Sequence, residues 1–421
     1  MIRTASAVRR RARFRRTAVL GFLAVMGPGI ITGFAGNDAG GVTTYTAVGA
    51  HYGYALLWLL LLSTAGLVVI QEMCARMGAV TGKGLSDLIR ERFGVRWTIV
   101  AMVALLIANG SNVVAEFAGV AASLELLGVE RIVSVPAAAI AIWVLVVFFS
   151  YRVVERALFV LLLAFVAYPA SAFIVRPDWD AVLRGLAVPT LSPGQAALIA
   201  ALALVGTTIT PYMQFYIQAS IVDKGIDREL YRFARVDVYL GALLTGINGF
   251  FIVVVAGAVL FPAHILVTSA SDAAQALGPL AGGQATLLFG VGLFGASLLA
   301  ATVMPLSTSY AICEAFGWES GISKNFREAP VFMGLFTLLV VLGALIVLSP
   351  SVPLIPVILV SQNVNGLLLP IVLVFILKLA GDRRIMGEHA NGRVSQVIGI
   401  GTAIGASALS IALVAITIVG G

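Results

Sequence analysis

Long apolar runs recur along this 421-residue chain, and they constrain its fold more than any other feature. Each run is about 18–25 residues long, which is the length that a helix needs to cross a hydrocarbon core of roughly 30 Å. Only 11% of the residues are charged, whereas a soluble domain carries about 25%. Because an open sheet would leave backbone groups without hydrogen bonds in lipid, the runs are predicted to be transmembrane helices.

We place eleven spans on the chain, which gives an all-α integral membrane protein. They cover residues 17–48, 54–78, 98–127, 134–150, 153–175, 194–220, 236–261, 282–312, 331–349, 353–379 and 395–419. Several spans are too long for one straight crossing, so tilted or broken helices are expected. The basic segment 1–16 is interpreted as a cytoplasmic collar on a retained first helix, because no small-residue cleavage site leads into a soluble domain.

The basic residues predict the orientation of the chain. If eleven spans alternate, all but three of the 27 Lys and Arg residues fall on the same side as the N-terminus; the exceptions are Arg131, Arg176 and Arg184. Since basic loops stay inside, we expect a protein of the cell membrane with its N-terminus in the cytoplasm and its C-terminus outside. The net charge of +7 therefore indicates membrane topology and no nucleic-acid partner.

The connections between the spans are short. Segment 81–96 combines charge with helical periodicity and predicts an interfacial helix, whereas segments 176–193 and 221–235 are expected to be simple loops.

The first span is interrupted by residues 33–41 (GFAGNDAGG), which hold four glycines and one aspartate. Each Gly costs about 1 kcal/mol relative to Ala in a helix interior, so an unwound segment is predicted. Its carbonyl oxygens and the Asp38 carboxylate would form a cation site in a discontinuous helix. The alternative, a neutral Asp38 that only packs, stays open; two separate crossings fail because the second piece is too short.

A second interruption lies in the sixth span, at residues 206–214 (GTTITPYMQ). Pro211 removes a helix hydrogen bond, and three threonines precede it. Interrupted helices at corresponding places in two halves indicate a transporter site. We therefore expect two inverted five-helix repeats, 17–175 and 194–379, with 395–419 as an additional helix.

Further polar residues lie inside two other spans: Asn109, Asn112 and Glu116 on one helix face, and Gln362, Asn363 and Asn365 in the tenth span. Burying an acid in a membrane is costly, so Glu116 is expected to serve the ion pathway or to hold a polar neighbour. For the amides, hydrogen bonding between helices is an equally good explanation. Glu72 and Asp237, near the inside ends of helices, are expected to form gating or anchoring ion pairs.

Three stretches of the sequence resemble the Nramp family of divalent-metal transporters. Residues 27–29 (GPG) and 37–41 (NDAGG) resemble its first-helix signature, residues 81–85 (TGKGL) and 89–94 (IRERFG) its connector after helix two, and residues 206–211 (GTTITP) its Gly-Ala-Thr-Val-Met-Pro segment in helix six. The resemblance implies a LeuT-type inverted-repeat fold, with broken helices one and six, and transport by alternating access.

The resemblance also implies a metal site at Asp38, Gly41, Thr207 and Thr210. In the family, an aspartate and an asparagine of helix one and a methionine sulfur of helix six bind the metal, and a helix-six carbonyl, here that of Thr207, joins them. Gly41 stands where the asparagine is expected, and Thr210 where the methionine is expected. Oxygen-only sites suit hard ions such as Mg²⁺, which also keeps several waters and needs room. The pattern is similar to the Nramp-related magnesium transporter branch.

Around the ion or along its pathway we expect Asn37, Glu116, Tyr212, Gln214 and Gln362. Glu116 and Gln362 match a glutamate and a glutamine of the family. Tyr212 and Ile217, however, stand where two histidines are expected, and Val113 where an aspartate is expected. Without a histidine that titrates near neutral pH inside the spans, the family's proton coupling is not expected here.

The sequence therefore predicts a carrier that imports Mg²⁺, or Mn²⁺, as a partly hydrated ion. One alternative is a proton-coupled symporter for Mn²⁺ or other transition metals. A more distant one is an amino-acid symporter of the same fold, against which Asp38 argues. No cofactor and no obligatory protein partner are expected. An enzyme is not expected either, because an intramembrane protease would need a second catalytic aspartate or a Ser–His pair.

Overall fold

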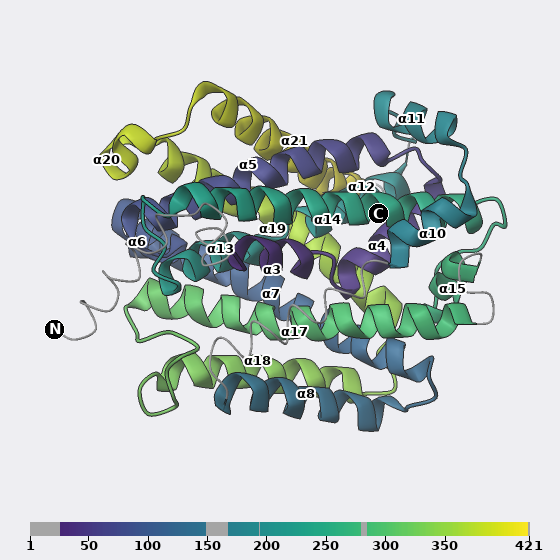
Figure 1. The fold of residues 1–421 in the computed structure, drawn as a ribbon, viewed down its shortest axis with the longest axis horizontal. Coiled ribbons are helices and arrows are strands. Elements are labelled where there is room, and N and C mark those ends of the chain that lie inside the picture. The colour runs from purple at the N-terminus through teal and green to yellow at the C-terminus, as the bar shows by residue number, and fades with distance from the viewer. Residues whose placement is uncertain (1–25, 149–166, 193, 279–283, 420–421) are drawn as a thin grey trace.

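Most of the long helices run roughly along the long axis of the molecule (Figure 1). The computed structural model describes residues 26–148, 167–192, 194–278 and 284–419. Every regular element in these ranges is a helix, which confirms the all-α prediction.

Nine helices in the described ranges are long and apolar enough to cross a membrane. They are α5 (Leu57–Thr81), α7 (Val95–Glu125), α8 (Arg131–Phe148), the pair α12 (Gln195–Thr208) and α13 (Pro211–Asp223), α14 (Tyr231–Val259), α17 (Ala285–Phe316), α18 (Pro330–Leu348), α19 (Leu354–Gly381) and α21 (Arg393–Val419). Each of them lies within a few residues of a predicted span.

The first predicted span is divided into α3 (Pro28–Ala35) and α4 (Ala39–Tyr52), as the glycine-rich segment indicates. Of the fifth predicted span, 153–175, the structure describes α10 (Ala167–Val175). Residues 17–25 and 153–166 of these two predictions lie outside the described residues.

Short helices fill several of the connections. The predicted interfacial helix is present as α6 (Leu85–Phe93). The prediction of a simple loop over 176–193 is wrong, because α11 (Trp179–Ala187) forms there and is capped by the Asp178 carboxylate, which accepts from the Asp180 and Ala181 backbone N–H groups. The remaining short helices are α15 (Ala270–Ala274), η2 (Gln275–Leu277), α20 (Arg383–Met386) and η4 (Gly387–His389).

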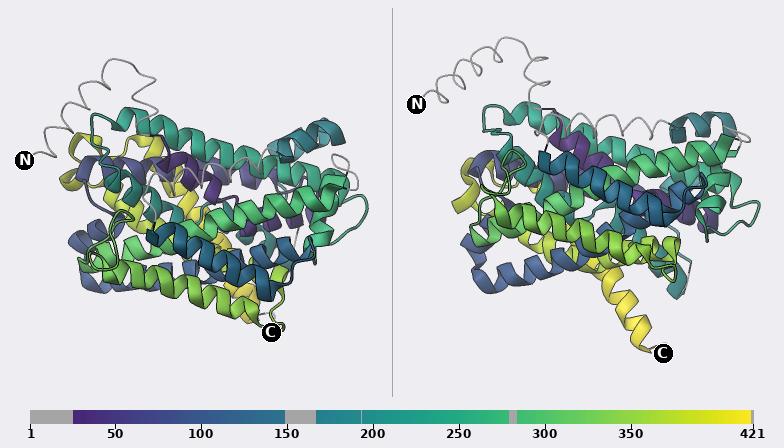
Figure 2. Two further views of the ribbon diagram at one scale, coloured as in Figure 1. Left: turned by 60° about the horizontal axis from the view of Figure 1, so that its bottom comes forward. Right: turned by 90° about the horizontal axis from the view of Figure 1, so that it is seen from below.

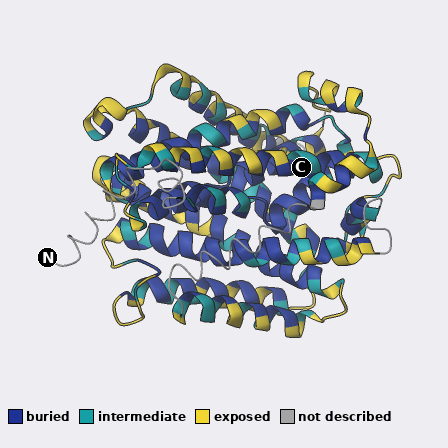
Figure 3. Ribbon diagram, in the orientation of Figure 1, coloured by how far each residue is buried: buried dark blue, intermediate teal, exposed yellow. Residues whose placement is uncertain are grey.

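The broken helices lie in the middle of the bundle. Helix α4 contacts α7, α12, α14, α17 and α19, and α13 contacts α3, α5, α7 and α17. Figure 3 shows the buried residues gathered on these inner helices and the exposed residues at the ends and outer faces. Helix α21 packs on the outside, and its C-terminal part projects from the bundle in one view of Figure 2. The centre of the bundle is therefore the place shielded from lipid.

The connecting segments collect at two opposite ends. Helices α6 and α20 lie at one end of the long axis, and α11 and α15 at the other (Figure 1). The eleven alternating spans of the sequence prediction require the same grouping.

Candidate cation site

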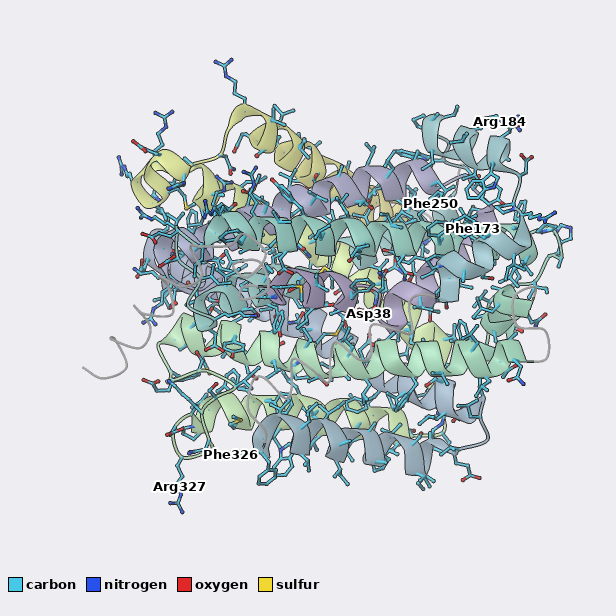
Figure 4. All side chains as sticks on the ribbon, in the orientation of Figure 1. Asp38, Phe173, Arg184, Phe250, Phe326 and Arg327 are labelled. Atoms are coloured by element: carbon cyan, nitrogen blue, oxygen red, sulfur yellow. The ribbon has the colours of Figure 1, made fainter. Side chains whose placement is uncertain are left out.

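The first break is a three-residue interruption between α3 and α4. The backbone N–H groups of Gly36 and Asn37 bond back to the Gly33 and Phe34 carbonyls, which ends α3 in a tight turn. Asp38 then starts α4: its Oδ1 accepts from the Gly41 N–H at 2.6 Å, a side-chain cap that satisfies one of the unpaired donors at a helix start. The break thus places a carboxylate at the middle of the bundle, where Figure 4 shows it.

Asp38 and Asn37 keep unsatisfied oxygen atoms in this position. Both side chains are fully buried. The Asn37 amide donates to the Thr245 carbonyl on α14 at 3.2 Å. Within the part of the chain that the structure describes, Asp38 Oδ2 and Asn37 Oδ1 have no hydrogen-bond partner. Since a buried polar group without a partner is costly, these oxygens are available to a ligand.

Glu116 brings a second carboxylate to the same turn. It lies on α7, is fully buried, and its Oε2 accepts from the Ala39 N–H at 3.1 Å. Its other oxygen, Oε1, has no partner among the described residues. The two acids therefore accept from backbone N–H groups two residues apart at the start of α4.

The second break separates α12 from α13 at Ile209 and Thr210, and Pro211 begins α13. The Thr210 hydroxyl turns back and donates to the Gly206 and Thr207 carbonyls at 3.1 and 3.0 Å. The Thr207 hydroxyl is buried and lacks a partner in the described ranges. Thr210 thus stabilises the broken turn, and Thr207 presents a free hydroxyl.

Gly41 marks the point where the two breaks meet. A Cβ atom on Gly41 would lie 2.7 Å from the Gly36 carbonyl oxygen, 3.5 Å from Asp38 Oδ1 and 3.5 Å from Thr207 Oγ1. A Cβ atom on the neighbouring Gly40 would lie 3.0 Å from Asp38 Oδ1 and 1.8 Å from Gln362 Nε2. Only glycine fits at these two positions, because the Gly36 carbonyl and the Gln362 amide approach the carboxylate where Cβ atoms would otherwise lie.

The structure brings most of the predicted residues to this point, but their side chains have different partners. Asp38, Gly41, Thr207, Glu116 and Gln362 surround the start of α4, and Thr210 lies on the same turn as Thr207. Asn37 directs its amide toward α14. Tyr212 and Gln214 are fully buried on α13, and no hydrogen bond of their side-chain polar atoms is recorded in the described residues.

The expectation that only oxygen atoms surround the first break is wrong, because the Met213 thioether lies beside it. A Cβ atom on Gly36 would be 1.7 Å from Met213 Cε and 3.4 Å from its sulfur, so only glycine admits this approach. The sulfur also accepts from the Gln71 amide at 3.7 Å. No local pattern in the sequence indicates this contact, because it depends on the packing of α13 against α3.

Two acidic side chains make polar contacts at the end of the bundle that holds α6. Glu72 and Arg76 form the expected ion pair at 3.2 Å. The Asp237 carboxylate is used as a helix cap: it accepts from the Gly27 and Gly29 N–H groups at 3.2 and 2.6 Å and so holds the start of α3 against α14.

The opposite end is open beside the inner helices. A cavity of about 430 Å³ lies between the end of α7, the start of α15 and the start of α19, with the Glu125 carboxylate on its wall.

The chemistry of the site is that of one or two carboxylates with neutral oxygens. No three His, Cys, Asp or Glu side chains come together as a metal cluster anywhere in the described ranges. Carboxylate, hydroxyl and carbonyl oxygens suit hard divalent cations, and half-helix ends at the middle of a membrane are where transporters place such ions.

A family model agrees with this architecture. The model described as natural resistance-associated macrophage protein-like (Nramp) matches residues 29–416. The chain is 26% identical to a divalent metal cation transporter MntH of Bacillus subtilis (strain 168), over 94% of this chain and 92% of the relative. It is 27% identical to an MntH of Granulibacter bethesdensis, over 94% of this chain and 88% of the relative.

Solved structures share the fold. A manganese transporter of Eremococcus coleocola, in complex with an aromatic bis-isothiourea compound, has a TM-score of 0.76 at 23% identity, covering 92% of this chain and 85% of that one. The transporter MhsT in complex with L-phenylalanine has a TM-score of 0.56 at 16% identity, covering 91% and 97%. These likenesses show the LeuT-type fold.

Proposed function

The chain belongs to the Nramp family, and from this premise we propose that it carries divalent metal cations across a membrane, with Mg²⁺ as its main cargo and Mn²⁺ as a second. Transport follows alternating access, in which the site opens first to one end of the bundle and then to the other. The relatives named divalent metal cation transporters support the class of cargo.

One observation carries the proposal: the Asp38 carboxylate lies buried in the first break, with one oxygen unbonded within the described residues. An unpaired buried carboxylate is unfavourable unless a cation compensates it. Intramembrane acids of this kind mark ion pathways. Asp38 is therefore the principal ligand, either directly or through a water molecule.

Neutral oxygens complete the shell. The Thr207 carbonyl already accepts from the Thr210 hydroxyl at 3.0 Å, so it retains one lone pair for an ion. The Thr210 oxygen donates its proton in this bond and keeps both of its lone pairs. The Thr207 hydroxyl, which has no partner among the described residues, is a further oxygen ligand. Gly41 has no side chain, so a water molecule serves as the ligand there. Glu116 and Gln362 act on the bound ion from the far side of the first turn of α4, and Asn37, Tyr212 and Gln214 lie along the pathway.

Mg²⁺ is proposed because two positions of the site lack the side-chain ligands expected in the family. Gly41 offers no side-chain ligand and Thr210 offers no thioether, so the ion keeps more of its own water. Mg²⁺ loses water reluctantly and prefers oxygen. A divalent ion that crosses the full potential gains about 4.6 kcal/mol per 100 mV, which drives import without protons; Tyr212, Ile217 and Val113 supply no proton relay.

The proposed location is the cell membrane, with the N-terminus in the cytoplasm and the C-terminus outside. The distribution of Lys and Arg supports this orientation. Figure 4 places Arg184, which is assigned to the outside, and Arg327, which is assigned to the inside, at opposite ends of the bundle.

Replacing Asp38 by Ala tests the function. The full chain is reconstituted into liposomes, and Mg²⁺ uptake is followed with an indicator dye. We expect a loss of about 100-fold, which corresponds to ~2.8 kcal/mol of lost ion stabilisation. Asp180→Asn, a change at an exposed acid on α11, is the control and should leave uptake intact. Unchanged uptake by the Asp38 variant contradicts the proposal.

A proton-coupled Mn²⁺ symporter is the second candidate, and the Met213 thioether beside Gly36 favours it. Thioether sulfur favours softer transition metals. Recording the internal pH of the liposomes during uptake separates the two functions. Acidification that depends on Mn²⁺ supports the symporter, whereas Mg²⁺ uptake at constant internal pH supports the uncoupled carrier.

A further inference from the structure

Three buried amides form a closed hydrogen-bonded cluster between α7 and α19, next to the first break. Asn112 and Asn365 bond to each other in both directions: Asn112 Nδ2 donates to Asn365 Oδ1 at 2.8 Å, and Asn365 Nδ2 donates to Asn112 Oδ1 at 2.9 Å. Asn365 Nδ2 also donates to Gln362 Oε1 at 2.9 Å. All three side chains are fully buried. We refer to Asn112, Gln362 and Asn365 as the amide triad.

The triad determines which face Gln362 shows to the cation site. Gln362 Nε2 donates to Ser361 Oγ at 2.9 Å and to Asn112 Oδ1 at 3.4 Å. The same nitrogen is the atom nearest to the Cβ position of Gly40, at 1.8 Å, and that position is 3.0 Å from Asp38 Oδ1. The Gln362 NH₂ group therefore faces the start of α4, and its carbonyl oxygen faces Asn365.

The same contacts are satisfied if all three amides rotate by 180° together. Each amide has one donor face and one acceptor face. After the joint rotation, each contact within the triad still pairs an NH₂ group with a carbonyl oxygen, but the residue that donated now accepts. Ser361, whose hydroxyl now donates to the Ile358 carbonyl at 2.7 Å, would donate to Gln362 instead. Rotation of Gln362 alone would set its NH₂ group against that of Asn365, and like faces cannot bond.

We propose that Asn112 and Asn365 are positioning residues for Gln362, and that the triad reverses as a unit when a cation reaches Asp38. Before a cation arrives, the Asp38 carboxylate is the dominant charge and favours the NH₂ face of Gln362. A bound cation repels that face and attracts the carbonyl oxygen. This inference rests on the proposed function, because the reversal responds to an ion beside Asp38.

Concerted reversal explains why the partners are amides. An apolar or acceptor-only neighbour would leave either Gln362 Oε1 or Nε2 without a partner in one of the two orientations, and a buried polar group without a partner pays the full desolvation penalty. The triad removes this penalty from both orientations. Gln362 can therefore stabilise the ion as it binds without holding it too tightly for release.

A double-mutant cycle on Mg²⁺ uptake in proteoliposomes tests the proposal. We expect Asn365→Leu and Gln362→Leu each to raise KM for Mg²⁺ about tenfold, the effect of one lost hydrogen bond to a charged group. If Asn365 acts through Gln362, the double variant is no worse than either single one. Independent effects that multiply to about 100-fold overturn the proposal.

Asn363→Leu is the matched control. Asn363 lies on the same helix, is half-buried, and donates to the Leu359 carbonyl outside the triad. It should change KM by less than about twofold; an effect equal to that of Asn365→Leu also overturns the proposal.

A second set of variants tests the proposal if Asn365→Leu does not fold. If Asn365→Leu alone unfolds because Asn112 is left unpaired, Asn112→Leu/Asn365→Leu removes both members of the pair, and the cycle is run with that variant under the same expectations. Wild type and Asp38→Ala are measured in parallel. If the wild type takes up Mg²⁺ and Asp38→Ala does not, single-variant effects on KM that multiply in the double variant refute only the positioning role. If the wild type and Asp38→Ala take up Mg²⁺ equally, the proposed function itself fails.

Discussion

The two breaks interrupt their helices by different means. The first consists of Gly36, Asn37 and Asp38 without a proline, and the Asp38 carboxylate caps the following helix. The second is followed by Pro211, whose missing N–H and rigid ring prevent a continuous helix. The second break is therefore built into the backbone, whereas the first uses a charged side chain that can also serve a ligand.

The breaks also differ in how their side-chain oxygens are used. In the second, Thr208 and Thr210 donate to carbonyls of their own turn, and Thr207 alone of the three has a hydroxyl without a recorded partner in the described residues. In the first, Asp38 and Asn37 each keep an unpaired oxygen there. One half of the molecule thus supplies charge and the other supplies neutral oxygens. A site with so little negative charge suits an ion that keeps part of its water.

Glu116→Gln tests whether the charge at the first break is shared. Glutamine can still accept from the Ala39 N–H, which Glu116 binds at 3.1 Å, but it carries no charge. We expect KM for Mg²⁺ to rise at least about tenfold, or ~1.4 kcal/mol, measured as uptake into liposomes. Glu130→Gln, at an exposed loop position, is the control. If KM stays the same, Glu116 serves only as a cap and all the charge comes from Asp38.

Gly41→Asn tests whether water of the ion occupies the place of a side chain at position 41. The new Cβ would lie 2.7 Å from the Gly36 carbonyl oxygen, so this carbonyl must shift, and 3.5 Å from Asp38 Oδ1 and Thr207 Oγ1, so the new amide would replace water around the ion. We expect KM for Mg²⁺ to rise relative to that for Mn²⁺ by about fivefold, because Mg²⁺ gives up water less readily. Competition between the two ions in one uptake assay measures the ratio.

The control for Gly41→Asn is Gly41→Ala, whose Cβ meets the same Gly36 carbonyl oxygen but carries no amide; it should leave the ratio unchanged. An unchanged ratio in Gly41→Asn, with intact uptake, would show that this position does not hold the water of the ion.

Both breaks were predictable because their causes are local. A run of glycines around one acid and a proline after threonines lie within a few residues of the chain, and their places in the two halves predict that they meet. The approach of Gly41 to Thr207 follows from that architecture.

Two other features depend on packing between distant segments, which no local pattern encodes, and a third is too short to be predicted. Met213 reaches Gly36 only because α13 packs on α3. Asp237 caps α3 from α14, over more than 200 residues of chain. Helix α11 has nine residues, too few for a periodic signal to stand out from a loop.

Thr207→Val tests which threonine hydroxyl of the second break contacts the ion. Valine keeps the shape and removes the hydroxyl that has no recorded partner in the described residues. We expect KM for Mg²⁺ to rise about threefold, or ~0.65 kcal/mol, with unchanged thermal stability. Thr208→Val is the matched variant: its hydroxyl bonds Leu204 and Tyr45, so it should lose about 1 kcal/mol of stability and keep its KM. The opposite pattern would assign the ligand role to Thr208.

Met213→Leu should have the smallest effect of these variants. It tests whether oxygen atoms alone bind the ion or whether the Met213 sulfur binds it as well. The thioether already accepts from the Gln71 amide and packs on Gly36, and leucine fills a similar volume at low cost. We expect less than about a twofold change in KM for Mg²⁺ and for Mn²⁺, with Met333→Leu, a fully buried methionine on α18, as the control. A tenfold or so loss confined to Mn²⁺ would place the sulfur among the ligands, and the second break would then supply a soft donor as well as neutral oxygens.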